Sequence, residues 1–488
     1  MSLSIGMDVA VSGLSVTAEQ TSIVSRNISR AGDPHASRKI ANVVSAYGGV
    51  RIASITRAAD KALLEKMLAA TTAASAQAAI AKALEALDQT NGDPELDASP
   101  AAQLAKFGST LQQFSQAPQD PILARTAVTA ARDLANALNA ATDIVQQVRA
   151  QADADIASSV SRVNDLLAKF EAVNNRIKLG TASNMDVTDD LDERDRLLAS
   201  ISKEIGIRTV TRGENDMVIF TDNGLTLFDT RPRAVTFSPT QAYIPATMGA
   251  AVFVDGVAVT GSTGMMGTAS GRIAALTQVR DSIAVTYQSQ LDEIARGLIS
   301  AFAESDQSAT PTLPDVPGLF TWAGSPALPP ASLQIGIAGS IKIAAGVDPA
   351  QGGNANLLRD GAISGNPAYR YNATGAAGFS DRLNGLLNSL DQQRTFDPSA
   401  AAGVSGTLSN FASSSVAWLQ AERKAATEAS DYKATLANRA SDALSSATGV
   451  NLDEEMTLLL ELERSYQASS KLIGTIDNMF GAVLAMVG

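Results

Sequence analysis

Cysteine is absent from the 488 residues, and histidine occurs only once, at His35. The lack of cysteine excludes disulfides, thiolate metal sites and cysteine nucleophiles. His35 lies in the turn-like stretch Ala31-Gly-Asp-Pro-His35, so we interpret it as a solvated loop residue. Because the acidic residues are not concentrated in a recognisable site either, we expect no catalytic residue, no metal site, no cofactor and no enzymatic activity.

Positive charge and long apolar runs are also scarce. The chain has 38 basic against 50 acidic residues and a formal net charge of -12, which argues against partners such as nucleic acid or an anionic membrane. No segment reaches the roughly 20 continuous apolar residues of a membrane span. The start, MSLSIGMDVAVSGLS, lacks the basic and apolar regions of a cleavable secretory signal. We therefore expect a chain that stays in the cytoplasm or leaves by a route that reads no such signal.

Nucleotide-binding glycine motifs are missing too. The glycine-rich piece from Gly261 to Gly267 has neither GxGxxG spacing nor a Walker lysine, so we interpret it as a turn. Hydrophobic residues make up 45% of the chain, which is enough for packed cores, and the length predicts several domains.

Large apolar side chains recur every seven residues near the C-terminal end. The first row contains Leu452, Leu459, Tyr466, Ile473, Phe480 and Val487. A second row contains Leu462, Ile476 and Val483, with Glu455 and Ser469 as interruptions. A helix with such a pattern is typical of packing against another helix.

The N-terminal end offers a partner for that helix. One row contains Leu3, Ala10, Thr17 and Val24, and the next contains Met7, Leu14, Thr21 and Ile28. Residues 3–29 are therefore predicted to form an amphipathic helix. Gly6 and Gly13 each cost about 1 kcal/mol relative to alanine, so we expect this helix to be ordered only when packed.

Between the ends, the composition switches twice. Residues 57–205 are rich in alanine and predict long helices, with breaks near residues 91–94 and 117–121. From Ile207 short β-branched and aromatic stretches alternate with turns at Asn223-Gly224 and Asp255-Gly256. The expected strands are 207–210, 217–220, 225–228, 234–237 and 252–254. Helices are expected again at about 270–303, at 380–393 and from about 407 onward, with a break at Gly449.

These patterns predict a mainly α-helical, elongated fold with an inserted β domain. Paired N- and C-terminal helices would belong to a discontinuous helical bundle that carries an antiparallel β domain. The expected units are a terminal coiled-coil core at 1–30 plus 449–488, a connecting stretch at 31–56, a helical rod domain at 57–206 plus 371–448, and an outer, largely β domain at 207–370 with a long helix at about 270–303. The terminal pair alone would equally suit the closing element of an ordinary bundle.

Particular residues resemble a known family. The stretch Gly449-Val-Asn-Leu-Asp-Glu-Glu-Met456, followed by Leu459, Tyr466-Gln-Ala468, Lys471, Ile473, Thr475 and Met479, resembles the C-terminal signature of flagellar axial proteins, most of all the hook-associated ones. At the other end of the chain, the family's N-terminal signature is matched by Ser12-Gly-Leu14, Asn27-Ile28 and Ser37-Arg38, which resemble it.

Two internal stretches sharpen the resemblance. They are Asp189-Asp-Leu-Asp-Glu-Arg-Asp195-Arg-Leu-Leu198, and Gly267 to Arg280-Asp281 leading into Leu291-Asp292. Rod and hook proteins share the terminal signatures but are not expected to have these. The loop Asp33-Pro-His-Ala-Ser-Arg38 departs from the family, whose usual run after the first helix is Asn-Thr-Pro-Gly-Tyr-Ser-Arg.

The resemblance implies a structural, self-assembling subunit at the junction between the flagellar hook and filament, secreted through the flagellar type III export channel and needed for motility. The implied partners are copies of the chain itself, the hook protein, the next hook-associated junction protein and an export chaperone on the C-terminal helix. Two alternatives stay open: another axial subunit of the hook or distal rod, and a coiled-coil scaffold unrelated to flagella. An enzyme fused to a helical rod fits least.

The expected assembly interface consists of residues from both ends of the chain. It contains Leu3, Met7, Leu14, Asn27, Ile28, Leu452, Met456, Leu459, Tyr466, Ile473, Ile476, Phe480 and Val483.

Overall fold

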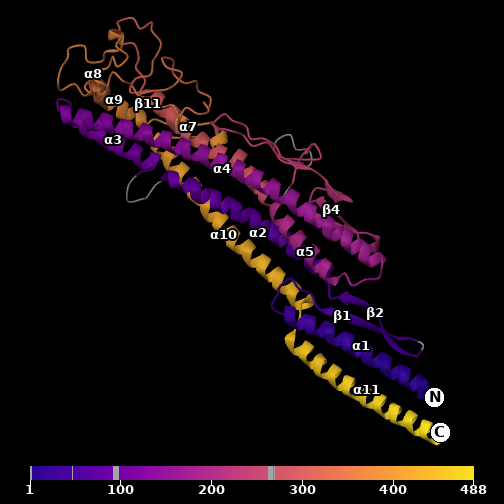
Figure 1. The fold of residues 1–488 in the computed structure, drawn as a ribbon. Coiled ribbons are helices and arrows are strands. Elements are labelled where there is room, and N and C mark those ends of the chain that lie inside the picture. Colours follow the sequence, from indigo (N-terminus) through magenta and orange to yellow (C-terminus); the bar gives the residue numbers. More distant parts are fainter. Residues whose placement is uncertain (1–2, 47, 92–97, 262–266, 269, 488) are drawn as a thin grey trace.

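The computed structural model describes the chain except for residues 1–2, 47, 92–97, 262–266, 269 and 488, and except for the side chain of Val487. The predicted turn from Gly261 to Gly267, the predicted break at 91–94 and the last member of the first apolar row therefore lie wholly or partly outside the described residues. The molecule is elongated, with a large helical body and a slender end that holds both chain termini (Figure 1).

Long helices form the body, as the alanine-rich composition predicts. They are α2 (Lys61–Asp88), α3 (Pro100–Gln116), α4 (Pro121–Ala182), α5 (Thr188–Glu204) and α10 (Leu408–Thr448), with the shorter α8 (Leu357–Asp360) and α9 (Asp381–Leu390). Their starts follow from local chemistry. The side chains of Asp60, Ser99 and Asp120 accept hydrogen bonds from the first backbone amides of α2, α3 and α4. Proline opens both α3 and α4, where its missing amide costs nothing.

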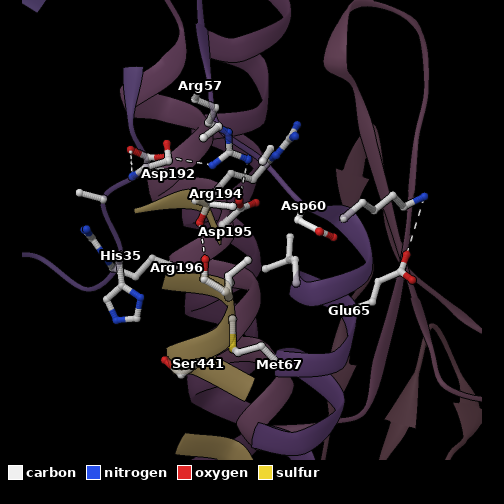
Figure 2. Close-up of a pocket in the computed structure, with 18 of the residues that line it drawn as sticks. His35, Arg57, Asp60, Glu65, Met67, Asp192, Arg194, Asp195, Arg196 and Ser441 are labelled. Carbon is white, nitrogen blue, oxygen red and sulfur yellow. Dashed lines mark hydrogen bonds and ion pairs between the residues drawn. The ribbon is translucent and has the colours of Figure 1, made fainter. Parts of the chain in front are cut away.

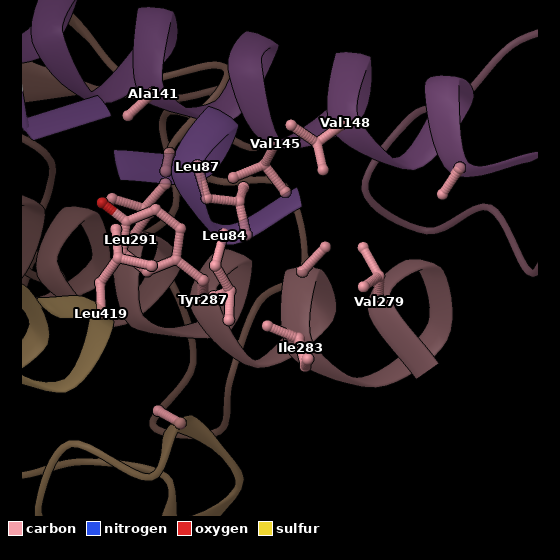
Figure 3. Close-up of a cluster of buried hydrophobic side chains, with 14 of the residues drawn as sticks. Leu84, Leu87, Ala141, Val145, Val148, Val279, Ile283, Tyr287, Leu291 and Leu419 are labelled. Atoms are coloured by element: carbon pink, nitrogen blue, oxygen red, sulfur yellow. The ribbon is translucent and has the colours of Figure 1, made fainter. Parts of the chain in front are cut away.

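The helix predicted at about 270–303 is present but contains a local irregularity. It consists of α6 (Arg272–Gln278), a π-helical turn (Val279–Ile283) and α7 (Ala284–Ala301). Its apolar stripe lies in the core of the body. Leu84, Val145, Leu291 and Leu419, from four different helices, meet there with less than 2% of each side chain exposed (Figure 3). The Tyr287 hydroxyl joins this core because it pairs with the Thr90 hydroxyl at 2.6 Å.

Short antiparallel strands follow α5, as the sequence predicts. One sheet contains β3 (Ile207–Thr211), β4 (Met217–Thr221), β5 (Thr226–Asp229) and β6 (Arg231–Pro232) in that order, and another contains β7 (Val235–Thr236), β8 (Phe253–Val254) and β9 (Val257–Ala258). The Asn164 side chain of α4 donates to the Val235 carbonyl at 2.8 Å and accepts from its amide at 3.1 Å. These contacts hold the strands along the flank of α4 (Figure 1).

The predicted outer β domain at 207–370 divides into two parts. Its strands lie beside α4 and α5, whereas the later part lies near α8 and α9 at the far end (Figure 1). That later part has little strand, with only β10 (Phe320–Thr321) paired to β11 (Lys342–Ile343). Another two-residue pair, β12 (Arg394–Thr395) and β13 (Ser405–Gly406), precedes α10. The Gly- and Pro-rich composition of residues 305–370 favours turns over a ladder.

The slender end is formed by α1 (Leu3–Arg30), β1 (Lys39–Ala46), β2 (Gly49–Arg57) and α11 (Leu452–Val487), which we call the terminal module. Most of the predicted connecting stretch at 31–56 folds here as a β-hairpin with a bulge between Asn42 and Val43. The hairpin packs on α1: a Cβ added at Gly49 would lie 1.8 Å from the Ser12 hydroxyl oxygen, which accepts the Val50 amide at 3.2 Å. The confirmed fold class is thus mainly α-helical with inserted antiparallel strands.

Candidate assembly interface

Helices α1 and α11 lie side by side in opposite directions (Figure 1). Gly6 faces Ile476, Gly13 faces Ser469, and Asn27 bonds to Glu455. Each advance of seven or fourteen residues along α1 is therefore matched by an equal retreat along α11, as an antiparallel pair of constant register requires. A Cβ at Gly6 or Gly13 would meet its neighbour at 3.6 or 3.8 Å, an ordinary contact, so these glycines face the partner helix without being required there.

The predicted interface residues divide into two groups. One group is half-buried within the terminal module. It contains Leu3, Met7, Leu14, Ile28, Leu459, Ile473, Ile476 and Phe480. The other group is more exposed, with 46–50% of each residue accessible to solvent. It contains Leu452, Met456, Tyr466 and Val483.

Asn27 belongs to neither group, since it is 2% exposed and hydrogen-bonds to Glu455 of α11. We call this buried pair of Asn27 and Glu455 the polar pin. The side-chain amide of Asn27 donates to the Lys39 carbonyl at 2.9 Å and to Glu455 at 3.0 Å, while its carbonyl accepts the Lys39 amide at 3.0 Å. Glu455, which is fully buried, also accepts from Arg38 at 2.6 Å. Glu455, which interrupts the second apolar row, thus links α11 to α1 and to the residue that precedes β1.

Sequence reasoning missed several exposed apolar residues of the terminal module. They are Ile5, Val9 and Val11 on α1, Ile40, Val43 and Val44 on β1, and Leu460, Leu472, Met479, Leu484 and Met486 on α11. A signal was available, because Leu472, Met479 and Met486 form a further seven-residue row beside the first. Two rows suffice for one partner helix, so a third row indicates more than one partner.

A cluster of ion pairs joins the terminal module to the body at α5 (Figure 2). Asp192, which is 1% exposed, accepts the Ser37 hydroxyl at 2.6 Å and the Ser37 amide at 3.3 Å. The Arg57 guanidinium of β2 reaches Asp192 at 2.9 Å and Asp195 at 2.6 Å. Burial lowers the pKa of Arg57, but Asp195 and Asp192 outweigh it, so the pKa lies above its ordinary value. Burial also raises the pKa of Asp195 against the pull of Arg57; the 2.6 Å contact is that of a charged pair.

The first acid of the same run, Asp189, receives two cations, Arg30 of α1 and Lys39 of β1. Burial lowers the pKa of Lys39 from 10.5 to about 8, even though neighbouring carboxylates oppose this change. The backbone amide of Arg38 donates to the Thr448 carbonyl of α10 at 2.8 Å, so the altered loop is tied to the body as well.

A pocket of about 180 Å³ lies at the joint, lined by residues that include His35, Asp60, Glu65 and Ser441 (Figure 2). His35 itself is exposed, in keeping with a solvated loop residue. In the described part of the chain, no group of three or more His, Cys, Asp or Glu residues is placed to hold a metal ion. Of the helices described, none is both long and apolar enough to cross a membrane.

Two family models match this chain. Residues 84–312 match the flagellar hook-associated protein FlgK helical domain, and residues 443–486 match the flagellar basal body rod FlgEFG protein C-terminal segment. Together these ranges cover a little over half of the chain.

Individual flagellar proteins are also similar to part of this chain. Flagellar hook-associated protein 1 of Salmonella typhimurium is 23% identical over 45% of this chain and 41% of its own length; that of Escherichia coli is 23% identical over 56% and 53%. The chain thus matches about half the length of these relatives. The flagellar hook junction protein FlgK from Burkholderia pseudomallei is 20% identical over 53% of this chain and 47% of its own, with a TM-score of 0.42, too low to carry an inference.

The matched models and the paired terminal helices define a structural protein of the flagellar axial class. Within that class, the helical-domain match and the curated relatives point to flagellar hook-associated protein 1, to which the chain is similar over about half of its length.

Proposed function

We propose that this protein is a structural subunit of the bacterial flagellum that forms the junction between hook and filament. The observation that carries the proposal is the apolar surface left on the terminal module after α1 and α11 have paired. Leu452, Leu472 and Met479 are each about half exposed, although they lie on a helix that is already packed on one side. Neighbouring subunits in a tube would cover them.

The energetics of covering this surface are favourable. Burying one large apolar side chain is worth about 1.5–3 kcal/mol, so several such positions per subunit would offset the entropy of ordering the two ends. The energy becomes available only where other molecules surround the module, so assembly would stabilise the two ends beyond their packing within one chain.

The proposal includes the partners and the location. The subunit would contact copies of itself, the hook protein and the next hook-associated junction protein, and would reach its extracellular site through flagellar export. An export chaperone would cover the exposed stripe of α11 beforehand, since an apolar helical face is a common target of a binding groove. The absence of cysteine suits a chain that is threaded unfolded through a channel.

A hook or distal-rod subunit is the alternative within the same class. The match to a hook-associated helical domain over residues 84–312 favours the junction role over that alternative. We propose no enzymatic activity for this chain.

Addition of the purified protein to isolated hook ends, followed by growth of filament from them, tests the proposal. Met479→Asp, at a half-exposed position of α11, should abolish addition while the body stays folded, because the charge would have to be buried between subunits. Ser470→Asp places the same charge at an exposed polar position of α11 and is the matched control. Normal addition of the Met479→Asp protein would contradict the proposed interface, and failure of the unsubstituted protein to add would contradict the junction role.

A further inference from the structure

The acidic run of α5 faces two different parts of the molecule. Asp190 pairs with Arg176 of α4 at 2.8 Å, which is a contact within the body. Asp189, Asp192 and Asp195 instead face the terminal module. Their spacing of three residues keeps all three acids along one side of the helix.

These three acids contact the N-terminal part of the module, residues 30–57, at each place where it borders α5. Asp189 pairs with Arg30 at the end of α1 and with Lys39 at the start of β1. Asp192 holds Ser37 in the connecting loop, and Arg57 closes the hairpin by reaching Asp192 and Asp195 together. The contacts join residues that lie 135–159 positions apart in the sequence, so they are tertiary restraints and not local caps.

Without these pairs, the connections between module and body would be weak restraints on direction. The chain passes between the two through residues 58–60 and 449–451, none of which is helical or in a strand. Short irregular segments of this kind are where hinge motions are absorbed. Besides the backbone bond from the Arg38 amide to the Thr448 carbonyl, the angle between module and body is therefore set by side-chain contacts across the joint.

The burial of the central pairs makes them suited to that task. The side chain of Asp192 is 1% exposed and that of Arg57 is 13% exposed, so salt screens their attraction far less than it screens a surface pair. Breaking such a pair from one side leaves a buried charge without its partner. The joint thus has one well-satisfied arrangement, and other angles would separate the charges.

We propose that Asp189, Asp192 and Asp195 are positioning residues that set the direction in which the terminal module leaves the body. They act through Arg30, Ser37, Lys39 and Arg57, and so decide where the apolar faces of α1 and α11 are presented. The use of this direction in a flagellar lattice rests on the proposed function, but the direction itself is a property of a single chain.

Distance measurements in the full-length protein test this directly. Because the chain has no cysteine, Ser15→Cys on α1 and Ser161→Cys on α4, both exposed, would carry a spin-label pair at defined positions. We expect a narrow distance distribution by pulsed electron paramagnetic resonance in the labelled parent. Asp192→Asn and Asp195→Asn should each broaden the distribution and shift its mean, while the thermal unfolding of the body is retained.

Asp190→Asn is the matched control, since it neutralises an adjacent acid of the same helix that faces the body. It should leave the distribution narrow, and Asp195→Glu should restore most of the narrowing lost in Asp195→Asn. The inference is overturned if the parent distribution is already broad, if Asp192→Asn and Asp195→Asn leave it unchanged, or if Asp190→Asn broadens it equally. A chain that fails to add to hook ends but shows the expected distances would refute the junction role and keep the positioning role.

Discussion

The body and the terminal module bury their apolar residues to very different degrees. In the body, fully buried side chains such as Phe107, Leu134 and Phe170 follow the helices from α2 to α10. In the module, Leu462 is the only apolar residue among those described in α11 that is buried, and it is still 7% exposed. Since helices in proteins owe most of their stability to packing, the body is stabilised mainly by its own core, whereas the module leaves much apolar surface that neighbours would cover.

The largest expected effect comes from breaking the core of the body. Phe107→Ala would remove a ring that packs 5.2 Å from Phe302 and 5.7 Å from Phe320, and should lower the free energy of unfolding by about 3–5 kcal/mol. Urea denaturation of the purified chain, followed by tryptophan fluorescence, measures the loss. Ile122→Ala is the control, because Ile122 is 70% exposed and its loss should change the free energy by less than about 0.5 kcal/mol. Equal effects of the two substitutions would contradict a body stabilised by its own core.

An intermediate effect is expected from the polar pin of the module. By the seven-residue pattern alone, Glu455→Leu completes the second apolar row and should strengthen the pairing of α1 with α11. In the structure it removes the acceptor of Asn27 and Arg38, which should cost about 1–3 kcal/mol of local stability.

Hydrogen exchange over residues 20–60 distinguishes these two expectations. Glu455→Leu should speed exchange there while the melting of the body is unchanged. Glu461→Leu, the same change at an exposed position of α11, should leave exchange over 20–60 as it is. Slower exchange in the Glu455→Leu protein would mean that the apolar rows matter more than the pin.

The smallest expected effect concerns the charge of Lys39. Burial lowers its pKa in the folded chain to about 8, below the ordinary value of 10.5, so between these pH values the unfolded chain binds more protons. The contribution of Lys39 to stability should therefore rise with pH across this window and be lost as pH falls through about 8. The charged groups that face it are Asp186, Asp189, Asp192, Arg26 and Arg30.

Lysine-labelled NMR measures this titration, with Lys39→Met as the assignment control. One ε-ammonium resonance should titrate near pH 8, and it should be missing in the variant. A Lys39 resonance that titrates near 10.5, with the exposed lysines, would show that the ion pair with Asp189 outweighs burial.

Local pattern predicted the elements well but not their contacts. The helical period of α4 and α10 and the alternation of β3 and β4 are visible in the sequence, because each depends on residues close together in the chain. The β1–β2 hairpin was missed because many of its residues are exposed and its apolar positions do not alternate clearly. The strands of 207–258 were predicted as strands, yet their place beside α4 depends on Asn164, which carries no sequence signal of that contact.

The interface shows the same division. The rows through Leu459 and Ile476 predict a helix pair, and the pair is present. The assignment of Asn27 to an intersubunit surface stays untested, and the structure places it inside one chain.

The sequence by itself determined the long helices, the short strands and the apolar stripes of both ends, because helical and strand periods are properties of neighbouring residues. Only the tertiary structure decided which stripe is covered by α1, which is left for other molecules, and why Asp192 and Glu455 are acidic. Those answers depend on groups far apart in the chain, Ser37 and Arg57 for the first and Asn27 and Arg38 for the second. A buried charge is tolerated only where such partners converge on it, and convergence is a property of three-dimensional packing.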